Sequence, residues 1–553
     1  MSDSQTPVPP KPRIADPRER YQARAQGFDA TNMIAYERPL EDPSYPEIWC
    51  YADRLSYKPG DEVCVHASAT TPSFELAIWR DGPEPRLISR HELSAPLTPL
   101  RGDFIASGCD WPVVLRWPVP HDLPSGFYLM LARAEMNGVV REQEHGFFVR
   151  SGAPGRDAKI LLVAATSTWT AYNDWGGANH YIGHNVPGGF PFAPRLSTQR
   201  PFARGLIFSP VGAPRKPHAF RVERGAVPRY PPIEFSYTRG LSKFYSNAGW
   251  ATYERPFCVW AERNGYRLDY ATQTDLHYDE ELLAPYDCVV LVGHDEYWTW
   301  EMREALDHYV TAGGHVARFG GNFFWQVRLE DGGRTQVCYK ELAGTHDPLL
   351  GTSAQRRVTA CWEDELVDWP GARSLGLNGA YGIYAHVGGQ APRASGGFTV
   401  YRPEHWAFAG TDAYYGDILG GDSRIFGYEV DGLDFTFRDG LPYPTFSDGA
   451  PPSVEILAMG LAYNTEALRG ARGEISYYGD TAPQLARLRY REDTPEARER
   501  ASRGSGMIVS FSQGRGAVFN AGSCEWVAGL HAADFQVEQM TRNVLDRFSG
   551  RGL

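Results

Sequence analysis

The spacing of hydrophobic residues changes near residue 158 and divides the chain into two regions. Between about 46 and 150, short runs such as Glu62–His66 and Glu75–Trp79 alternate between apolar and polar residues. This alternation, interrupted by turn residues, predicts an antiparallel β-sandwich of the immunoglobulin-like type. From Lys159 onward the apolar runs are continuous, which is typical of strands buried on both faces of a largely parallel sheet. The sequence therefore predicts a β-sandwich followed by an α/β domain.

This pattern predicts three parts and one covering segment. Residues 1–45 are rich in Pro, Arg and Asp and are expected to form an arm, followed by the sandwich at 46–150 and the α/β domain at 158–548. Residues 178 to about 245 are rich in Gly, Pro and aromatic residues and have little periodicity. A nonperiodic insertion of this length is usually functional, so we expect it to fold as a lid over the strand ends.

One β-α-β unit places polar side chains directly after a buried strand. The run Val289–Val292 predicts that strand, Gly293 interrupts it, and the polar and aromatic segment His294–Trp298 follows. Thr299 is placed to cap the next helix, and His315–Phe319 predicts the strand after it. Because sites in open α/β sheets lie at the carboxyl ends of strands, the sequence predicts an active site at this corner.

The spacing alone leaves structural interpretations of the same residues open. Glu296 can cap the next helix while Tyr297 packs in the core. Glu429 and Asp431 lie two residues apart on one face of a short predicted strand, where such carboxylates are usually solvated. Glu525 follows another predicted strand and can point into the same crevice.

Composition and charge narrow the classes of function. The net charge is −12 and no basic stripe is present, which argues against a nucleic-acid partner. No run approaches ~18 apolar residues, so no membrane span is expected, and the first residues lack the features of a secretory signal. The 8 cysteines include no CxxC pair, which suits the reduced thiols of a cytoplasmic protein and does not match zinc-cluster spacing.

Motifs for the common nucleophiles are also missing. There is no Gly-x-Cys-x-Gly or Gly-x-Ser-x-Gly elbow and no phosphate-binding glycine loop. Metal-assisted or carboxylate chemistry is therefore the remaining candidate.

A set of motifs, in order along the chain, resembles the large (beta) subunit of N,N-dimethylformamidase and its relatives. The motifs are Ala171–Gly177, Tyr253–Pro256, Trp260–Gly265, Gly293–Trp298, Gly427–Asp431, Gly516–Ser523 and Asn543–Phe548. The resemblance covers about 158 to 548. It implies a glutamine-amidotransferase-like α/β fold without the cysteine chemistry of the amidotransferases.

The resemblance further implies a mononuclear Fe(III) site held by two tyrosinates and one glutamate. Carried over by motif, it assigns Tyr297 and Glu429 as ligands and Tyr253 as the second tyrosinate. Phenolate and carboxylate are hard anionic oxygen donors and suit Fe(III). Such an ion can polarise an amide carbonyl and activate water, and we expect His294 or Glu525 to carry the proton to the departing amine.

The sequence thus predicts a cytoplasmic, iron-dependent amidohydrolase that cleaves the C–N bond of a small, N-substituted, non-peptide amide, like N,N-dimethylformamidase. A homo-oligomer is expected, and the resemblance adds a small companion subunit as a candidate partner. The alternative is a non-catalytic sugar- or partner-binding protein in which a degenerate amidotransferase-like domain serves as the scaffold.

Overall fold

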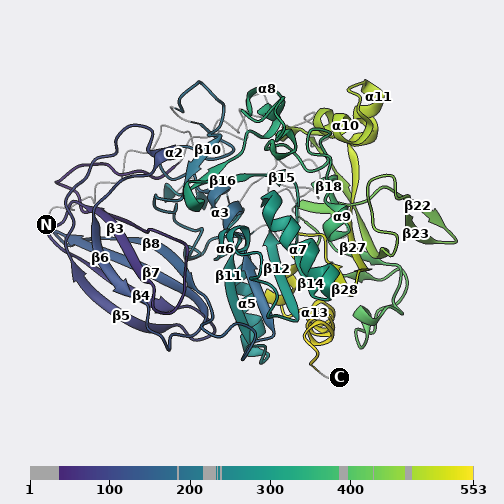
Figure 1. Cartoon of the computed structure of the whole chain (residues 1–553), viewed down its shortest axis with the longest axis horizontal. Coiled ribbons are helices and arrows are strands. Elements are labelled where there is room, and N and C mark those ends of the chain that lie inside the picture. The colour runs from purple at the N-terminus through teal and green to yellow at the C-terminus, as the bar shows by residue number, and fades with distance from the viewer. Residues whose placement is uncertain are drawn as a thin grey trace, which may run out of the picture.

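The computed structural model describes residues 36–183, 186–215, 232, 235–236, 239–384, 396–427, 429–467 and 476–551. Most of the predicted arm and parts of the predicted lid therefore lie outside the described residues. Two regions lie next to each other in Figure 1, strands β1 to β8 at one end and a large sheet with its helices at the other.

The first region consists of two sheets that share one core. A five-stranded sheet has the order β2 (Ser56–Tyr57), β8 (Val139–Val149), β7 (Gly126–Met136), β4 (Phe74–Arg80), β5 (Arg86–Leu93). A three-stranded sheet has the order β1 (Ile48–Ala52), β3 (Glu62–Ala69), β6 (Val113–Pro118), and the short helix α2 (Phe104–Ser107) precedes β6 in the chain. Val65 of one sheet and Leu76 and Phe147 of the other belong to the same buried cluster. The alternating residues of these strands therefore point into the space between the two sheets.

A nine-stranded mixed sheet organises the second region. Its first five strands run parallel in the order β11 (Leu268–Thr272), β9 (Ile160–Ala164), β12 (Cys288–His294), β14 (His315–Gly321), β28 (Gly516–Asn520). The other four continue it with antiparallel pairing in the order β27 (Arg503–Gln513), β24 (Glu455–Tyr463), β19 (Phe398–Val400), β20 (Ile418–Leu419). The carboxyl ends of the parallel strands consequently lie at one edge of the sheet.

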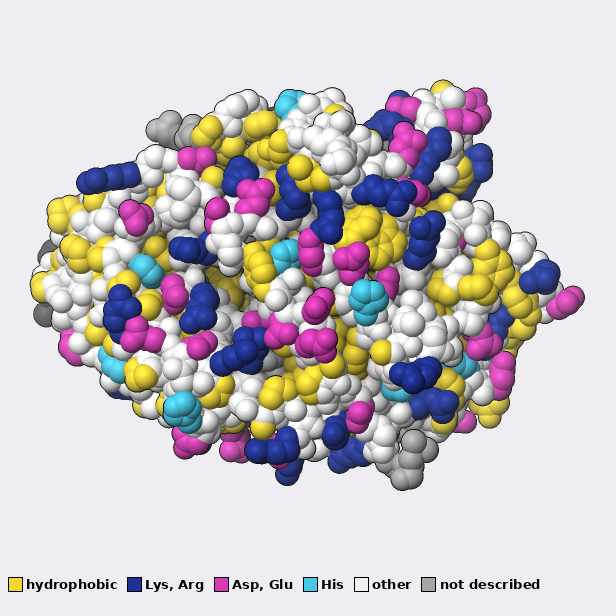
Figure 2. Space-filling view, in the orientation of Figure 1, with side chains coloured by type: hydrophobic (Ala, Val, Ile, Leu, Met, Phe, Trp, Pro, Cys, Tyr) yellow, Lys and Arg dark blue, Asp and Glu magenta, His cyan; other side chains and the backbone are white. Residues whose placement is uncertain are grey.

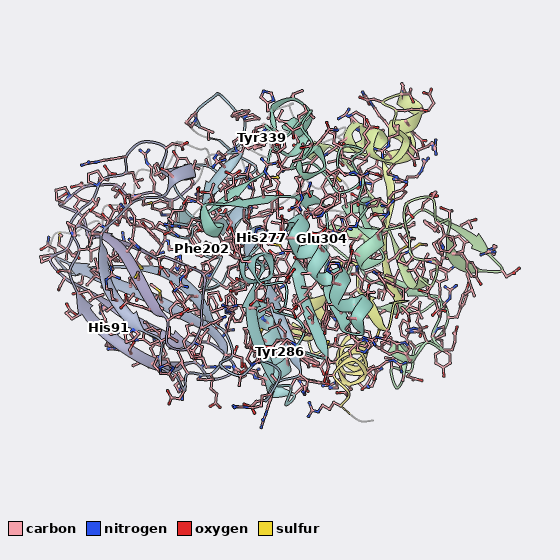
Figure 3. All side chains as sticks on the ribbon, in the orientation of Figure 1. His91, Phe202, His277, Tyr286, Glu304 and Tyr339 are labelled. Carbon is pink, nitrogen blue, oxygen red and sulfur yellow. The ribbon has the colours of Figure 1, made fainter. Side chains whose placement is uncertain are left out.

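Helices cover both faces of this sheet, as the residues of β12 show. Val290 and Val292 enter one buried cluster and Leu291 enters another, so both faces of the strand are covered. The helices α6 (Gln273–Tyr278) and α7 (Trp300–Ala312) pack on the face of Leu291, and Figure 3 labels His277 and Glu304 on them. On the other face lie α5 (Glu254–Arg263), α12 (Trp526–His531) and α13 (Phe535–Phe548).

Smaller elements complete the second region. They are α3 (Thr166–Tyr172), β10 (Arg195–Ser197), β13 (Tyr297–Trp298), β15 (Trp325–Gln326), β16 (Arg328–Glu330), β17 (Thr335–Val337), α8 (Ala343–His346), α9 (Ala372–Leu375), β18 (Asn378–Tyr384), β21 (Glu429–Gly432), β22 (Phe435–Arg438), β23 (Leu441–Pro444), β25 (Thr465–Ala467), β26 (Ser476–Asp480), α10 (Ala482–Tyr490) and α11 (Pro495–Ala501). Within the described part of the chain, no helix is both long and apolar enough to cross a bilayer. The face shown in Figure 2 carries acidic and basic side chains side by side.

The two regions share a buried interface. Phe127 of β7 stacks on Trp250, with ring centroids 4.4 Å apart, and both rings belong to the same core cluster as Ile160 of the large sheet. Asp81, directly after β4, accepts hydrogen bonds from Trp250 Nε1 at 2.7 Å and from Arg255 Nε at 2.7 Å. The first region therefore holds the start of α5, next to Tyr253, in place.

We expect Asp81→Asn to lower the free energy of unfolding by about 1–3 kcal/mol, because hydrogen bonds to a largely buried charge are lost. Chemical denaturation measures this change. The matched control is Asp157→Asn, since Asp157 pairs with Arg156 at the surface, where the side chains are 65% and 72% exposed. Equal denaturation midpoints for the two variants would contradict the importance of the Asp81 contacts.

Candidate functional site

Glycines allow three segments to meet at the end of β12. Gly293 has a φ of 75°, and a Cβ built on it would lie 2.2 Å from the Cβ of Tyr253. A Cβ on Gly321, at the end of β14, would lie 2.6 Å from the backbone nitrogen of Cys524. The end of β12 therefore approaches the side chain of Tyr253, and the end of β14 approaches the backbone around Cys524, more closely than a Cβ at either glycine would permit.

His294, the last residue of β12, lies between two carboxylates. It is 1% exposed, and its Nδ1 is 2.6 Å from the backbone oxygen of Asn247. Its Nε2 is 2.9 Å from Glu429 Oε2 and 3.2 Å from Glu296 Oε2. Burial lowers the pKa of His294, but the two carboxylates outweigh burial and raise it to about 10. This placement between Glu296 and Glu429 favours the protonated ring. Asn322 Nδ2 donates to Glu429 Oε2 at 2.9 Å and lies 3.2 Å from His294 Nε2.

Two phenols converge on Glu296. Tyr172, the last residue of α3, donates to Glu296 Oε2 at 3.0 Å, and the hydroxyl of Tyr181 lies 2.7 and 2.9 Å from the two carboxylate oxygens. The hydroxyl of Tyr297 in turn donates to that of Tyr181 at 2.8 Å. Burial raises the pKa of Tyr181, and the charge of Glu296 raises it further, which favours the neutral phenol. We call Tyr172, Tyr181 and Glu296 the Glu296 cluster.

Lys340 adds positive charge beside this cluster. Its Nζ lies 3.6 Å from the centroid of the Tyr181 ring and 5.1 Å from that of Trp325, and the residue is only 6% exposed. Its backbone φ of 52° is unusual for a residue with a side chain. The pKa of Glu296 is lowered, since the hydrogen bond and charge of His294, together with Lys340, outweigh burial.

A second carboxylate–phenol pair lies next to these residues. The hydroxyl of Tyr253 donates to Glu525 Oε1 at 3.0 Å, and Arg215 Nη2 is 3.5 Å from Glu525 Oε2. The ring of Tyr253 lies 6.3 Å from the ring of His294. The backbone nitrogen of Cys524 donates to the backbone oxygen of Glu429. The pair of Tyr253 and Glu525 therefore adjoins the segment that carries Glu429.

The structure distributes the predicted site residues over three groups. Glu429 pairs with His294, the hydroxyl of Tyr297 donates to Tyr181, and that of Tyr253 donates to Glu525. The contacts found for the three predicted ligands thus involve three different partners.

Two structural interpretations of the sequence are wrong. Thr299, not Glu296, caps α7, because its side chain accepts a hydrogen bond from the backbone nitrogen of Met302. Glu429 and Asp431 are not solvated: they are 6% and 0% exposed. The neighbouring segments bury them, which the spacing of two carboxylates could not indicate.

Sequence reasoning missed Tyr172, Tyr181 and Asn322. The sequence could have indicated Tyr172 as a site residue, since it follows a buried strand and lies within the motif Ala171–Gly177. It could not have indicated Tyr181, because that residue lies in the nonperiodic segment that was predicted only as a lid. Asn322 follows two glycines and has a φ of 59°, a conformation in which Asn is commoner than most residues.

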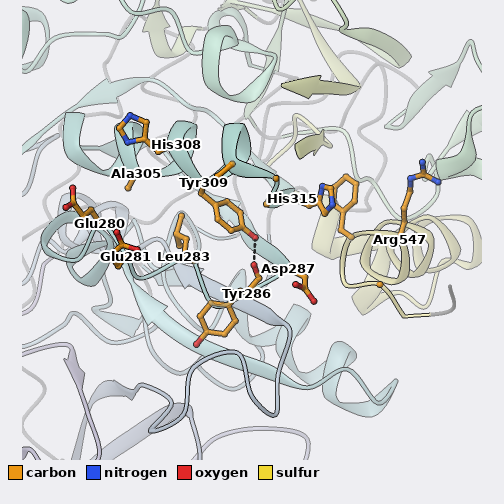
Figure 4. A pocket seen from close by; sticks show the side chains of 16 residues that line it. Glu280, Glu281, Leu283, Tyr286, Asp287, Ala305, His308, Tyr309, His315 and Arg547 are labelled. Atoms are coloured by element: carbon orange, nitrogen blue, oxygen red, sulfur yellow. Dashed lines mark hydrogen bonds between the residues drawn. The ribbon is translucent and has the colours of Figure 1, made fainter. Parts of the chain in front are cut away.

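A separate pocket of 630 Å³ lies at the opposite end of the parallel strands (Figure 4). It is lined by Tyr309, His315 and Arg547 together with acidic side chains such as Asp287. His315 begins β14 and Gly321 ends it, so the length of the strand separates this pocket from the site at His294.

The fold and the site together describe an α/β protein with a buried cluster of phenols, carboxylates and an imidazole at the carboxyl edge of its sheet. The sequence model of the family described as "N,N-dimethylformamidase beta subunit-like, C-terminal" matches residues 77–541, and the chain belongs to this family. The match begins inside the first region, within β4.

Among characterised proteins, the chain is similar to the N,N-dimethylformamidase beta subunit of Alcaligenes sp.. The two are 23% identical over 479 residues, which are 80% of this chain and 54% of the relative. The chain therefore spans about half the length of that relative. Among solved structures, trypsin-activated alpha-2-macroglobulin from Escherichia coli matches with a TM-score of 0.16 and 12% identity, over 23% of this chain and 8% of that one. This likeness is too low to support any argument about fold or function.

Proposed function

We propose that this protein is an iron-dependent amidohydrolase that cleaves the C–N bond of a small, N-substituted, non-peptide amide. The observation that carries the proposal is the Glu296 cluster, in which two phenols and one carboxylate meet in a buried position. Membership of the N,N-dimethylformamidase beta subunit-like family supports the same class of reaction.

The donor set of the Glu296 cluster fits Fe(III). Phenolate and carboxylate oxygens are hard anionic ligands, and three of them neutralise a trivalent ion. Tyr172, Tyr181 and Glu296 would hold the ion, which when bound would polarise an amide carbonyl and lower the pKa of a water molecule. The set predicted from the sequence, Tyr253, Tyr297 and Glu429, remains the alternative. The contacts favour the Glu296 cluster because both of its phenols already hydrogen-bond to its carboxylate.

The surrounding side chains have roles that follow from their contacts. The hydroxyl of Tyr297 donates to the oxygen of Tyr181 and would stabilise a phenolate there. Lys340 lies over the ring of Tyr181 and adds positive charge that acts on Glu296.

His294 is the group that we propose to protonate the departing amine. Its Nε2 lies between Glu296 and Glu429, which favour a proton there, and the hydrogen bond from Asn322 orients Glu429. Glu525, the other predicted proton carrier, accepts from Tyr253 in the adjacent pair, which supports a role in holding that phenol.

The assembly state is part of the proposal. The relative from Alcaligenes is by name a beta subunit, and we propose that this chain forms a homo-oligomer that also takes a small companion subunit. Mass measurement of the native complex purified from its source tests both.

We expect protein purified without chelators to contain about one iron per chain and to show a tyrosinate-to-iron absorption band in the visible range. Chelator-stripped protein is the control, and iron added back should restore both the band and the hydrolysis of at least one small N-alkylamide. A colourless, metal-free protein that hydrolyses no amide in a panel of formamides and acetamides would favour the non-catalytic alternative.

A further inference from the structure

Beneath the site, one arginine contacts the segments that carry its polar residues. Arg318 lies in the middle of β14 and is 0% exposed. Its Nη1 is 2.7 Å from Asp431 Oδ2, and its Nε is 3.6 Å from Asp295 Oδ2. Asp295 and Asp431 are 2% and 0% exposed. We call these three residues the Arg318 network.

Each carboxylate of the network lies on a different chain segment that carries site residues. Asp295 stands between His294 and Glu296 in the chain, and its Oδ1 accepts from Trp298 Nε1 at 2.7 Å. Asp431 lies two residues after Glu429 on the four-residue strand β21. A displacement of either carboxylate therefore displaces a backbone segment that carries a site residue.

Asp431 also holds the turn that carries Asn322. Its two oxygens accept hydrogen bonds from the backbone nitrogen of Phe323 at 3.1 and 3.3 Å. Asn322, the residue before, has a positive φ and donates to Glu429. Such a conformation persists only where the surroundings fix it, and the hydrogen bonds of Phe323 to Asp431 contribute to fixing it here.

We propose that Arg318 is a positioning residue, which sets the distances between Glu296, Glu429 and the ring of His294 by holding Asp295 and Asp431 at fixed places. The guanidinium suits this role because its planar fork reaches two carboxylates at once, whereas an ammonium ion offers one point of charge. The consequence for turnover rests on the proposed amidase function, but the consequence for the position of His294 does not.

The primary test is Arg318→Lys, which keeps the charge and loses the fork. We expect the variant to fold, and the side-chain NMR resonance of His294 to shift in ¹⁵N-histidine-labelled protein. The measurement uses chelator-stripped protein, because a ferric ion next to Glu296 would broaden the resonance. The His294→Gln variant identifies that resonance. The matched control is Arg402→Lys, since Arg402 is also buried, at 8% exposed, but adjoins the antiparallel half of the sheet. It donates to the backbone oxygens of Ile456 and Pro442. In that control the His294 resonance should stay in place.

Asp431→Asn is the second variant and decides the question if Arg318→Lys does not fold. Its amide oxygen can still accept from Phe323, but the charge that pairs with Arg318 is gone. We expect kcat to fall by about 100-fold in both network variants, the usual effect of a 1 Å misplacement, while KM changes little.

An unchanged His294 resonance in folded Arg318→Lys, or in Asp431→Asn where Arg318→Lys does not fold, would overturn the positioning role. If the wild-type protein hydrolyses no amide, the proposed function fails, and the resonance of His294 still decides the role of Arg318.

Discussion

Glu296→Gln is expected to lose bound iron and to reduce kcat/KM by at least about 1,000-fold. The carboxylate accepts hydrogen bonds from both Tyr172 and Tyr181, so its neutral amide analogue removes the charge around which the phenols converge. Loss of a metal ion removes several kcal/mol of transition-state stabilisation, and each 1.36 kcal/mol is a factor of ten in rate. Iron content by elemental analysis and steady-state kinetics measure the two effects separately.

Four Tyr→Phe variants decide between the two ligand sets. Tyr172→Phe and Tyr181→Phe should lose iron and the visible absorption band. Tyr253→Phe should retain full iron, because its hydroxyl donates to Glu525. Tyr297→Phe should keep iron but shift the band, since it removes a hydrogen bond to the oxygen of Tyr181. The opposite result, in which Tyr253→Phe, Tyr297→Phe and Glu429→Gln lose iron while Tyr172→Phe and Tyr181→Phe retain it, would restore the assignment made from the sequence motifs.

The second large effect is expected at Gly293. A Cβ at this position would lie 2.2 Å from the Cβ and 2.4 Å from the Cγ of Tyr253, and φ is already 75°. Neither strand β12 nor the start of α5 can move away without breaking the packing of the sheet. We therefore expect Gly293→Ala to cost more than about 4 kcal/mol of unfolding free energy, which places it among the most damaging single substitutions.

Gly212→Ala separates the backbone strain from the clash. Gly212 has a φ of 73°, but a Cβ built on it would meet nothing within 4 Å. The strain alone costs roughly 1–2 kcal/mol, so Gly212→Ala should lose about that much in thermal or chemical unfolding. Similar losses for the two variants would show that the approach of Tyr253 to Gly293 is not as tight as the structure has it.

Local signals in the sequence predicted the strand and the helix on either side of His294–Trp298. The apolar run at Val289–Val292 is part of β12, and Thr299 caps α7 as its position predicted. Asn264 caps the carboxyl end of α5, and Gly265 follows with a φ of 77°, a conformation that favours glycine. These features depend on neighbours in the chain, which is why a sequence pattern is sufficient to find them.

The contacts of the site could not be read in the same way. Strand β12 extends past Gly293 to His294 because His294 pairs with Gly321 of the neighbouring strand. Tyr181 reaches Glu296 because the side chain of Asn179 holds a local turn. Its Oδ1 accepts a hydrogen bond from the backbone nitrogen of Tyr181, and its Nδ2 donates to the backbone oxygen of Tyr172. Such interactions join residues far apart in the chain or arise in segments without periodicity. The residue types therefore predicted a site at the end of β12, but they did not predict the partner of each side chain.

The contact between Phe127 and Trp250 limits how the gene for this protein can be shortened or recombined in evolution. A gene shortened to the large sheet and its helices would encode a protein with exposed aromatic rings, and it would lose the contacts of Asp81 that hold Trp250 and Arg255. The two regions must then be inherited as one unit, because a recombination event between them separates the halves of a single core.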